Sequence, residues 1–509
     1  MNQDNGGIIG KVNTPTTTVA SGIWSLDSQF DSQSSSIWPL AFPNTTIANS
    51  CRFDNGSSDY LSRTPSSAGN RRTFTISTWF KLSDIDTWSA IISAGSSGND
   101  HTEITFNGGT GNDPDIEFKH YNGSSFDIQL ETDRVFRDVS AWYHIVIEVD
   151  TTQATSSDRV KMYINGVQET SFATSTYPSQ NFQTNFNNTN IHTIGRGTQS
   201  GTASTRVYFD GYMAETVLID GTALDPTSFG AFNPVTNIWE PIGYGGTYGT
   251  NGFRLDFANS SALGNDVSGN DNDFTVNNLT SVDQSTDTCS NNFATWNSLT
   301  NGSYQTLSDG NLKGTGNTST NNGNTWSTIH FPSAGKWYWE TKVTAHSSSA
   351  NYPQVGIIRD NTIAQGDMNT GDGGYVSGSK DCYYPAGSTT VYSKDGNDTV
   401  SATSVNDILM CAMDSTAGAM KFWIGVNGTW FASGDPANGN NAQWAETGDF
   451  QPVAFQSNFN NSVSETNFGA PTFSISSGNA DANGHGNFEY APPTGFFALC
   501  TKNLAEFGG

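Results

Sequence analysis

The stretch that decides the fold is residues 335–343, Gly-Lys-Trp-Tyr-Trp-Glu-Thr-Lys-Val, a run of aromatic and β-branched residues in the second half of the chain. Residues 141–149, Ala-Trp-Tyr-His-Ile-Val-Ile-Glu-Val, form a similar run in the first half. Such short runs, bounded by turn-forming residues, are typical of β-strands. Each has a companion of the same kind, residues 74–80 and residues 420–426. Because the two groups lie far apart and no long helical pattern occurs, the sequence predicts an all-β chain of two tandem antiparallel β-sandwiches.

Asn-Gly pairs mark two of the expected hairpin turns. Asn165-Gly166 separates residues 160–164 from residues 167–169, and Asn427-Gly428 follows residues 420–426. Both residue types tolerate the positive φ angles of two-residue hairpin turns, so each pair predicts a hairpin between neighbouring strands.

The composition fits a loop-rich protein built from strands. Of 509 residues, 34% are hydrophobic, 12% are aromatic and 14% are charged, and 53 are glycine. The aromatic content argues against disorder, and the chain is long enough for two or three domains. The 22 basic and 48 acidic side chains give a net charge of −26. That charge repels phosphate backbones, so we expect no nucleic-acid binding.

The cysteines and the first ten residues indicate the cellular compartment in which the protein is made. The chain has five cysteines, Cys51, Cys289, Cys382, Cys411 and Cys500. They are far apart, and no Cys-x-x-Cys pair indicates zinc, so we interpret them as small buried residues of a protein made in a reducing cytoplasm. No apolar run is long enough to span a membrane, so we expect no membrane insertion. Residues 1–10 lack a basic segment followed by an apolar core, so we expect no secretory signal.

Changes in pattern divide the chain into four segments. Residues 1–49 are expected to form an extended N-terminal arm, in which Trp24 and Trp38 lie in small apolar clusters. Those clusters suit docking onto a partner, and packing on the first sandwich would explain them equally well. The other segments are residues 50–232, the first sandwich, residues 233–300, a linker with short strands, and residues 301–509, the second sandwich.

The first block resembles laminin-G-like or concanavalin A-like jelly rolls. The resemblance covers most of residues 50–232 and implies two antiparallel sheets that display loops for recognition. The matching pieces follow in the expected order, at residues 52–56, 59–61, 74–80, 142–146, 161–166, 194–196 and 209–215.

The second block resembles a SPRY domain. The resemblance covers residues 301–500 and implies a second β-sandwich. The matching pieces are residues 335–340, 355–357, 406–414, 420–423, 451–455, 467–469 and 492–496.

The strongest enzyme-like motif is Asp113-Pro114-Asp115-Ile116-Glu117. Carboxylates two residues apart share one face of a strand. Glycoside hydrolases on concanavalin A-like folds resemble this motif, with such carboxylates as nucleophile and acid/base. The motif departs from theirs, because Pro114 interrupts a central strand and Asp113 stands where those enzymes carry Glu. A solvated loop entering a strand edge explains it as well, so we expect no catalytic residue and no enzyme activity.

A second polar cluster offers oxygen ligands of the kind that calcium prefers. It consists of Asp266, Asn270, Asp271 and Asp273. An EF-hand loop would carry glycine at its sixth position, where Asp271 stands, and clusters of Asn, Asp and Gly usually form turns. Calcium therefore remains open, the metal ligands stay unassigned, and no other cofactor is expected.

Histidines and loop aromatics complete the candidates. We expect His144, in a strand beside Trp142, to be a satisfied interior residue, whereas His120 beside Tyr121 suits a surface contact. Aromatic side chains on loops stack against sugars or partner side chains at low entropic cost, and core packing would also explain each of them. The aromatic candidates are Tyr244, Tyr248, Tyr375, Tyr383, Tyr384 and Trp444.

The order of arm, jelly roll and SPRY-like module is similar to that of structural proteins of marine tailed bacteriophages. The resemblance implies a non-enzymatic virion protein, a tail- or head-fibre-like adhesin that binds glycans or proteins of the host surface. It implies other virion proteins as partners of the arm, and a homo-oligomer such as a trimer, whose repeated weak sites act together. Two alternatives remain open, a capsid decoration or adaptor protein and a glycoside hydrolase that trims host polysaccharide.

Overall fold

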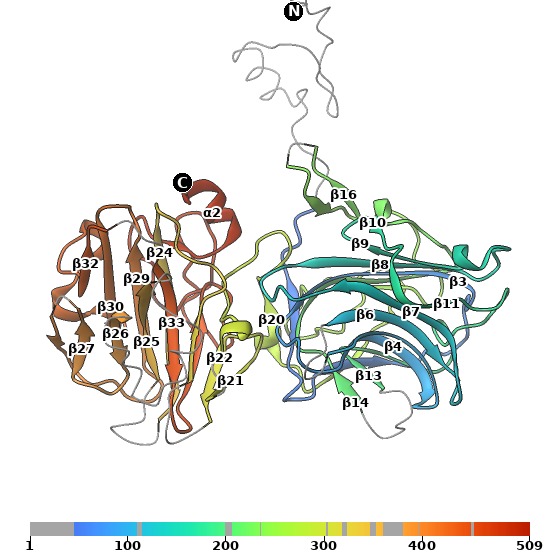
Figure 1. Ribbon diagram of the computed structural model, residues 1–509, viewed down its shortest axis with the longest axis horizontal. Coiled ribbons are helices and arrows are strands. Elements are labelled where there is room, and N and C mark those ends of the chain that lie inside the picture. The colour runs from blue at the N-terminus through green and yellow to red at the C-terminus, as the bar shows by residue number, and fades with distance from the viewer. Residues whose placement is uncertain are drawn as a thin grey trace, which may run out of the picture.

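The computed structural model describes residues 45–108, 114–198, 206–234, 236–301, 304–317, 323–346, 353–359, 380–394, 396–448 and 452–508. They form two β-sandwiches that lie side by side (Figure 1). The predicted all-β fold with antiparallel sheets is confirmed. The expected arm, up to residue 44 and with Trp24 and Trp38, lies outside the described residues.

The first sandwich consists of two large sheets. The first sheet runs in the order β10 (Val167–Gln168), β9 (Val160–Ile164), β8 (Tyr143–Asp150), β3 (Thr73–Leu82), β15 (Gly211–Asp220), β1 (Ser50–Phe53) and β20 (Gln284–Ser285), and β18 (Phe253–Leu255) also pairs with β15. The second sheet runs in the order β11 (Phe172–Thr176), β7 (Phe126–Val135), β6 (Asp115–Tyr121), β5 (Asp100–Phe106), β4 (Ser89–Ser97), β12 (Ile191–Ile194), β2 (Tyr60–Arg63) and β19 (Thr275–Asn277).

The second sandwich also has two sheets. One runs in the order β21 (Gln305–Ser308), β22 (Lys313–Gly316), β34 (Val463–Asn467), β24 (Lys336–Ala345), β29 (Ile408–Asp414), β30 (Met420–Val426) and β31 (Thr429–Trp430), with β32 (Trp444–Glu446) beside β30 and β35 (Phe497–Ala498) beside β24. The other runs in the order β23 (Gly323–Trp326), β33 (Pro452–Asn458), β25 (Gln354–Arg359), β26 (Lys380–Pro385), β27 (Thr390–Ser393) and β28 (Asp398–Thr399).

Smaller elements lie outside these sheets. Two hairpins pair β13 (Arg196–Thr198) with β14 (Arg206–Tyr208), and β16 (Gly230–Phe232) with β17 (Trp239–Pro241). The α-helix α2 (Thr501–Phe507) follows β35, and the 3-10 turns are Ser156–Asp158, Pro226–Ser228, Ser281–Asp283, Ser298–Thr300, Phe431–Ser433 and Pro436–Asn438. Of the helices in the described ranges, none has the length and apolar character needed to span a bilayer.

Alternation along the strands builds the two cores. Along β24, the rings of Trp337 and Trp339 enter the core of the second sandwich, while Tyr338 points to the other face. The consecutive aromatic residues 337–339 therefore pack on both sides of the sheet, because successive side chains of a strand point in opposite directions. On that other face Tyr338 packs against Phe488 and belongs to the same apolar cluster as Phe293.

Both predicted Asn-Gly hairpins are present. Asn165 and Gly166 have φ angles of 49° and 78°, and Asn427 and Gly428 have φ angles of 47° and 82°. These are the positive angles that the turn requires. Gly166 is needed for a second reason, because a Cβ atom there would lie 2.4 Å from the ring of Trp239.

Residues 233–300, expected as a linker, contribute strands to the first sandwich. β18 pairs with β15 and β20 pairs with β1, so both extend the first sheet. β19 pairs with β2 and extends the second sheet. The segment then continues into the second sandwich, where Trp296 is fully buried in the core.

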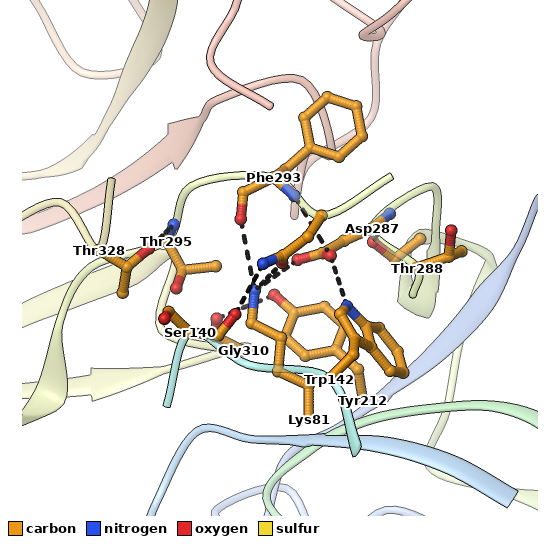
Figure 2. Close-up of polar contacts among 12 residues, drawn as sticks. Lys81, Ser140, Trp142, Tyr212, Asp287, Thr288, Phe293, Thr295, Gly310 and Thr328 are labelled. Atoms are coloured by element: carbon orange, nitrogen blue, oxygen red, sulfur yellow. Dashed lines mark hydrogen bonds and ion pairs between the residues drawn. The ribbon is translucent and has the colours of Figure 1, made fainter. Parts of the chain in front are cut away.

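A polar junction joins the two sandwiches (Figure 2). Nζ of Lys81, from β3, lies 2.9 Å from Oδ2 of Asp287 and 2.8 Å from Oδ1 of Asn292. It also donates to the carbonyl of Phe293, whose ring packs against the second sandwich. The hydroxyl of Tyr212, from β15, donates to the carbonyl of Gly310 at 2.9 Å. These buried polar groups therefore link the two sandwiches by specific contacts.

Candidate ligand-binding sites

One face of the second sheet of the first sandwich carries charged side chains. Along β6, core residues alternate with Asp115, Glu117 and Lys119, which therefore face away from the core. Thr105 of β5 and Glu131 of β7 flank Glu117 in register. We call this surface the acidic face, and its members are Glu103, Thr105, Asn107, Asp115, Glu117, Lys119, Gln129 and Glu131.

Glu117 is fully engaged on the acidic face. Its Oε2 lies 2.6 Å from Nζ of Lys119, and its Oε1 accepts a hydrogen bond from Gln129 at 2.8 Å. The residue is 3% exposed. Both carboxylate oxygens are therefore held by neighbours and are turned away from solvent.

Asp115 shares a hydrogen-bond donor with a second carboxylate. Nδ2 of Asn107 lies 2.9 Å from Oδ1 of Asp115 and 3.2 Å from Oε1 of Glu131. Burial, followed by the negative charge of Glu131, raises the pKa of Asp115 to about 7. The motif correctly places Asp115 and Glu117 on one strand face, whereas Asp113 lies outside the described residues. Glu131 was missed because only strand pairing brings it there.

The acidic face does not support glycoside hydrolysis. That reaction needs a protonated acid and a second carboxylate that is free to attack or to activate water. Asp115 meets the first condition, but Glu117 is held by Lys119 and Gln129. Oε2 of Glu131 accepts a hydrogen bond from Thr174 at 2.8 Å, and Glu103 lies 3.2 Å from a ring nitrogen of His101.

A second candidate is a pocket on the outer face of the first sheet, which we call the aromatic pocket. It lies between β3, β15 and the segment that carries β16 and β17, and Figure 1 shows β16 over this sheet. The free space measures about 360 Å³, the open mouth of the pocket included. The lining residues are Thr45, Ile47, Ser77, Trp79, Glu215, Val217, Phe229, Pro241, Ile242, Gly243, Tyr244 and Arg254.

A strained residue fixes the polar side of the aromatic pocket. The pairing of β15 with β3 shifts between Ala214 and Val217, and Glu215 in this bulge has a φ of 49°. Nε and Nη2 of Arg254 each lie 2.8 Å from a carboxylate oxygen of Glu215. A non-glycine residue in the left-handed region costs about 1 kcal/mol or more, so its persistence at a pocket points to function.

Aromatic rings line the other side of this pocket. The half-buried ring of Tyr244 lies 5.4 Å from that of Phe229 and 5.3 Å from that of Tyr248. Tyr248 is 9% exposed and packs with Phe229 in an apolar cluster. Of the six predicted stacking candidates, Tyr244 therefore lines the pocket, and Tyr248 packs behind Tyr244.

His144 is a satisfied interior residue, as predicted. Its Nδ1 lies 3.0 Å from Nε1 of Trp239, and its Nε2 lies 2.8 Å from Oγ of Ser77. Because an indole nitrogen only donates, Nδ1 must accept, and Nε2 carries the proton of the neutral ring. Ser77 is consequently the acceptor and not an activated nucleophile. Burial lowers the pKa of His144 to about 3.

The cluster of Asp266, Asn270, Asp271 and Asp273, for which calcium was one of two interpretations, forms a turn held by its own side chains. Asp266 accepts hydrogen bonds from the backbone of Arg254 and Asn272, and Asp273 accepts one from the backbone of Asp266. Asn270 donates to the carbonyl of Gly252. Across the part of the chain that the structure describes, no three or more His, Cys, Asp or Glu side chains are grouped to hold a metal.

The remaining candidates are core residues. Tyr384 and Trp444 are 0% and 1% exposed in the second sandwich, and Tyr383 is stacked on Tyr392 at 5.1 Å. Tyr375 lies outside the described residues. The surface contact expected for His120 is wrong, because its ring is buried, hydrogen-bonded to Thr102 and packed edge-on against Phe182.

Comparison with known proteins agrees with the fold of the first sandwich. Residues 55–228 match the family model described as the concanavalin A-like lectin/glucanases superfamily, of the laminin G type. This confirms the laminin-G-like resemblance for that part of the chain. No curated protein matches the chain.

Similar solved structures include a SPRY domain and laminin G domains. The SPRY domain of human HERC1 is 14% identical, with 34% of this chain and 96% of that chain covered and a TM-score of 0.25. Domains LG4-5 of the mouse laminin alpha1 chain are 9% identical, with 83% and 88% covered and a TM-score of 0.28. Domain 4 of AbnA, an extracellular arabinanase of Geobacillus stearothermophilus in complex with arabinotriose, is 18% identical, with 44% and 88% covered and a TM-score of 0.26.

Proposed function

We propose that this chain is a non-enzymatic, carbohydrate-binding adhesin and that the aromatic pocket is its sugar site. The match of residues 55–228 to a lectin-like family supports the class of ligand.

The observation that carries the proposal is the pairing of Tyr244 with a fixed Glu215–Arg254 pair in one pocket. A sugar presents an apolar ring face and several hydroxyl groups, so it needs an aromatic platform beside groups that both donate and accept hydrogen bonds. The guanidinium and the carboxylate supply both kinds of group in one plane. Because Arg254 and the bulge hold Glu215 in place, a sugar would lose little affinity to the ordering of these side chains.

A glycan array followed by calorimetry tests the sugar site. The intact protein is expected to bind a subset of glycans, and Tyr244→Ala to weaken that binding about tenfold through the loss of ring contact. Glu215→Gln is expected to weaken it as well, because one charged acceptor is lost. Tyr244→Phe keeps the ring, and Val405→Ala changes an exposed residue of the second sandwich, so both should bind normally. Absence of glycan binding, or full binding by Tyr244→Ala, would contradict the proposal.

The finer proposal is that the adhesin is a structural protein of a bacteriophage particle. The order of arm, jelly roll and SPRY-like module supports it, as does the net charge of −26. In this proposal residues 1–49 bind other virion proteins, the sandwiches face the host surface, and several copies assemble as a homo-oligomer such as a trimer. Repeated weak sugar sites would then gain avidity.

Deletion of residues 1–44 separates attachment from sugar binding. The shortened chain should still bind glycans and should no longer enter particles, as measured by mass spectrometry of purified virions. Retained incorporation would overturn the role of the arm. Incorporation by the intact chain without any glycan binding would favour a decoration or adaptor protein.

A further inference from the structure

Two carboxylates of the acidic face lie close together without a cationic hydrogen-bond partner. Asp115 and Glu131 both receive their hydrogen bonds from neutral groups, the amide of Asn107 and, for Glu131, the hydroxyl of Thr174. Lys119 makes its 2.6 Å contact with Glu117 instead. Like charges on a partly buried surface repel one another strongly, so this pair favours any cation that can reach it.

Buried acceptors beside the two carboxylates have no hydrogen-bond partner. Oδ1 of Asn107 has none, although that residue is 8% exposed. Oγ1 of Thr105 has none either, at 1% exposed, and it lies on the same face in register with Glu117. A buried polar atom without a partner is unfavourable and needs an explanation, such as an ion or water that the site normally holds.

The spacing of these atoms fits a hard divalent cation. The side-chain amide of Asn107 lies 2.9 Å from one carboxylate oxygen and 3.2 Å from the other. Calcium binds oxygen at about 2.3–2.6 Å, so neighbouring oxygens in its shell are roughly 3 Å apart. Rotation of the Asn107 amide by half a turn would bring Oδ1 to the position of Nδ2 and complete a set of three oxygens. The two atoms of such an amide are distinguished only by their hydrogen bonds.

We propose that Asp115, Glu131 and the side-chain oxygen of Asn107 form a calcium site on the acidic face. Water completes the coordination, and the hydroxyl of Thr105 is placed to contact one such water. With two charged ligands the site is weak, in the range of about 0.1–1 mM that extracellular calcium modules show. It differs from the loop of residues 266–273, where the carboxylates of Asp266 and Asp273 are already used by the turn.

Calorimetric titration of the full chain with calcium chloride tests the site, after removal of metals with a chelator. One equivalent should bind with a dissociation constant of about 0.1–1 mM. Asp115→Asn and Glu131→Gln should each weaken binding at least tenfold. Asp271→Asn makes the same chemical change in the loop of residues 266–273 and should leave the titration unchanged.

Three outcomes would overturn the calcium site. The first is the absence of any heat of binding at a calcium concentration of about 10 mM, tenfold above the highest expected dissociation constant. The second is loss of binding in Asp271→Asn with normal binding in Asp115→Asn, which would place the ion in the loop. The third is unchanged binding in both acidic-face variants. Circular dichroism of each variant confirms folding, and the titration of the unaltered chain decides the first outcome without any variant.

Discussion

Nζ of Lys81 lies 2.9 Å from Oδ2 of Asp287, and both side chains are 1% exposed. The pair stands between two sandwiches, with Lys81 on β3 and Asp287 on the chain that leads into the second sandwich. The other oxygen of Asp287 accepts a hydrogen bond from Nε1 of Trp142 at 3.0 Å. The charges are therefore paired and hydrogen-bonded, which a buried ion pair requires.

Removal of one partner from this pair should destabilise the protein strongly. Asp287→Ala leaves the Lys81 ammonium buried with only carbonyl and amide oxygens, and should lower the free energy of unfolding by about 3–5 kcal/mol. Urea unfolding followed by tryptophan fluorescence measures the loss. The double variant Lys81→Met, Asp287→Asn removes both charges and should lose less than the sum of its single variants. Additive losses would contradict a direct interaction.

Acid should destabilise the protein through His144. Its pKa is about 3 in the folded state, because of burial, against about 6.5 in an unfolded chain. Between these values the unfolded chain binds a proton that the folded chain does not, so stability falls as the pH falls, by about 1.4 kcal/mol per pH unit. His144→Gln keeps a donor and an acceptor but does not titrate. Urea unfolding at pH 7, 5.5 and 4.5 gives the free energy of unfolding of the unaltered protein and of His144→Gln. The difference between the two free energies should become smaller as the pH falls. A difference that does not change with pH would exclude this role of His144.

Trp239 should stabilise the neutral form of His144. Trp239→Phe keeps an aromatic ring but removes the Nε1 proton that Nδ1 of His144 accepts. The loss of this buried hydrogen bond should cost about 1–3 kcal/mol. The midpoint of urea unfolding at pH 7.5 measures it. Ile238→Ala, on the same hairpin and 60% exposed, is the control and should change the midpoint little.

The thiols should react little with a disulfide reagent while the protein is folded. None of the five cysteines forms a disulfide within the described residues. Cys289 is half-buried, whereas Cys51, Cys382, Cys411 and Cys500 are buried. Burial raises the pKa of Cys51 strongly and that of Cys500 to about 11, so little reactive thiolate is present. Titration with a disulfide reagent should detect Cys289 at most before urea is added and all five thiols afterwards. Fewer than five thiols in urea would indicate a disulfide.

Strand and turn positions could be predicted from the sequence, because their causes are local. The runs around Trp337 and Tyr143 have the alternation of strands, and Asn165 and Asn427 precede the glycines of their turns. The interpretation of the cysteines as buried residues holds for four of them. The contribution of residues 233–300 to the first sandwich could not be predicted, because β18 and β20 have only three and two residues and gain their order from distant partners.

The candidate sites show the same division between local and distant causes. Carboxylate spacing predicted that Asp115 and Glu117 share a face, since a strand alternates with a period of two. Glu131 comes from the neighbouring strand, and Arg254 reaches Glu215 from 39 residues away, so neither was visible as a motif. His120 was misplaced because its burial depends on Phe182 and Thr102, which approach only in the fold.

Strand β1 determines how the molecule would bear a mechanical load. Its Cys51 pairs with Met213 on one side and with Gln284 on the other, so β1 lies inside the sheet and not at its edge. Before β1 in the chain, the backbone N–H of Thr45 donates a hydrogen bond to the carbonyl of Pro241. A tether that pulls on the residues ahead of Thr45 would have to break the bonds along both borders of β1 before that strand could slide out. Tension would therefore load the hydrogen bonds of β1 in shear. The first sandwich would rotate to align with the force before it began to unfold.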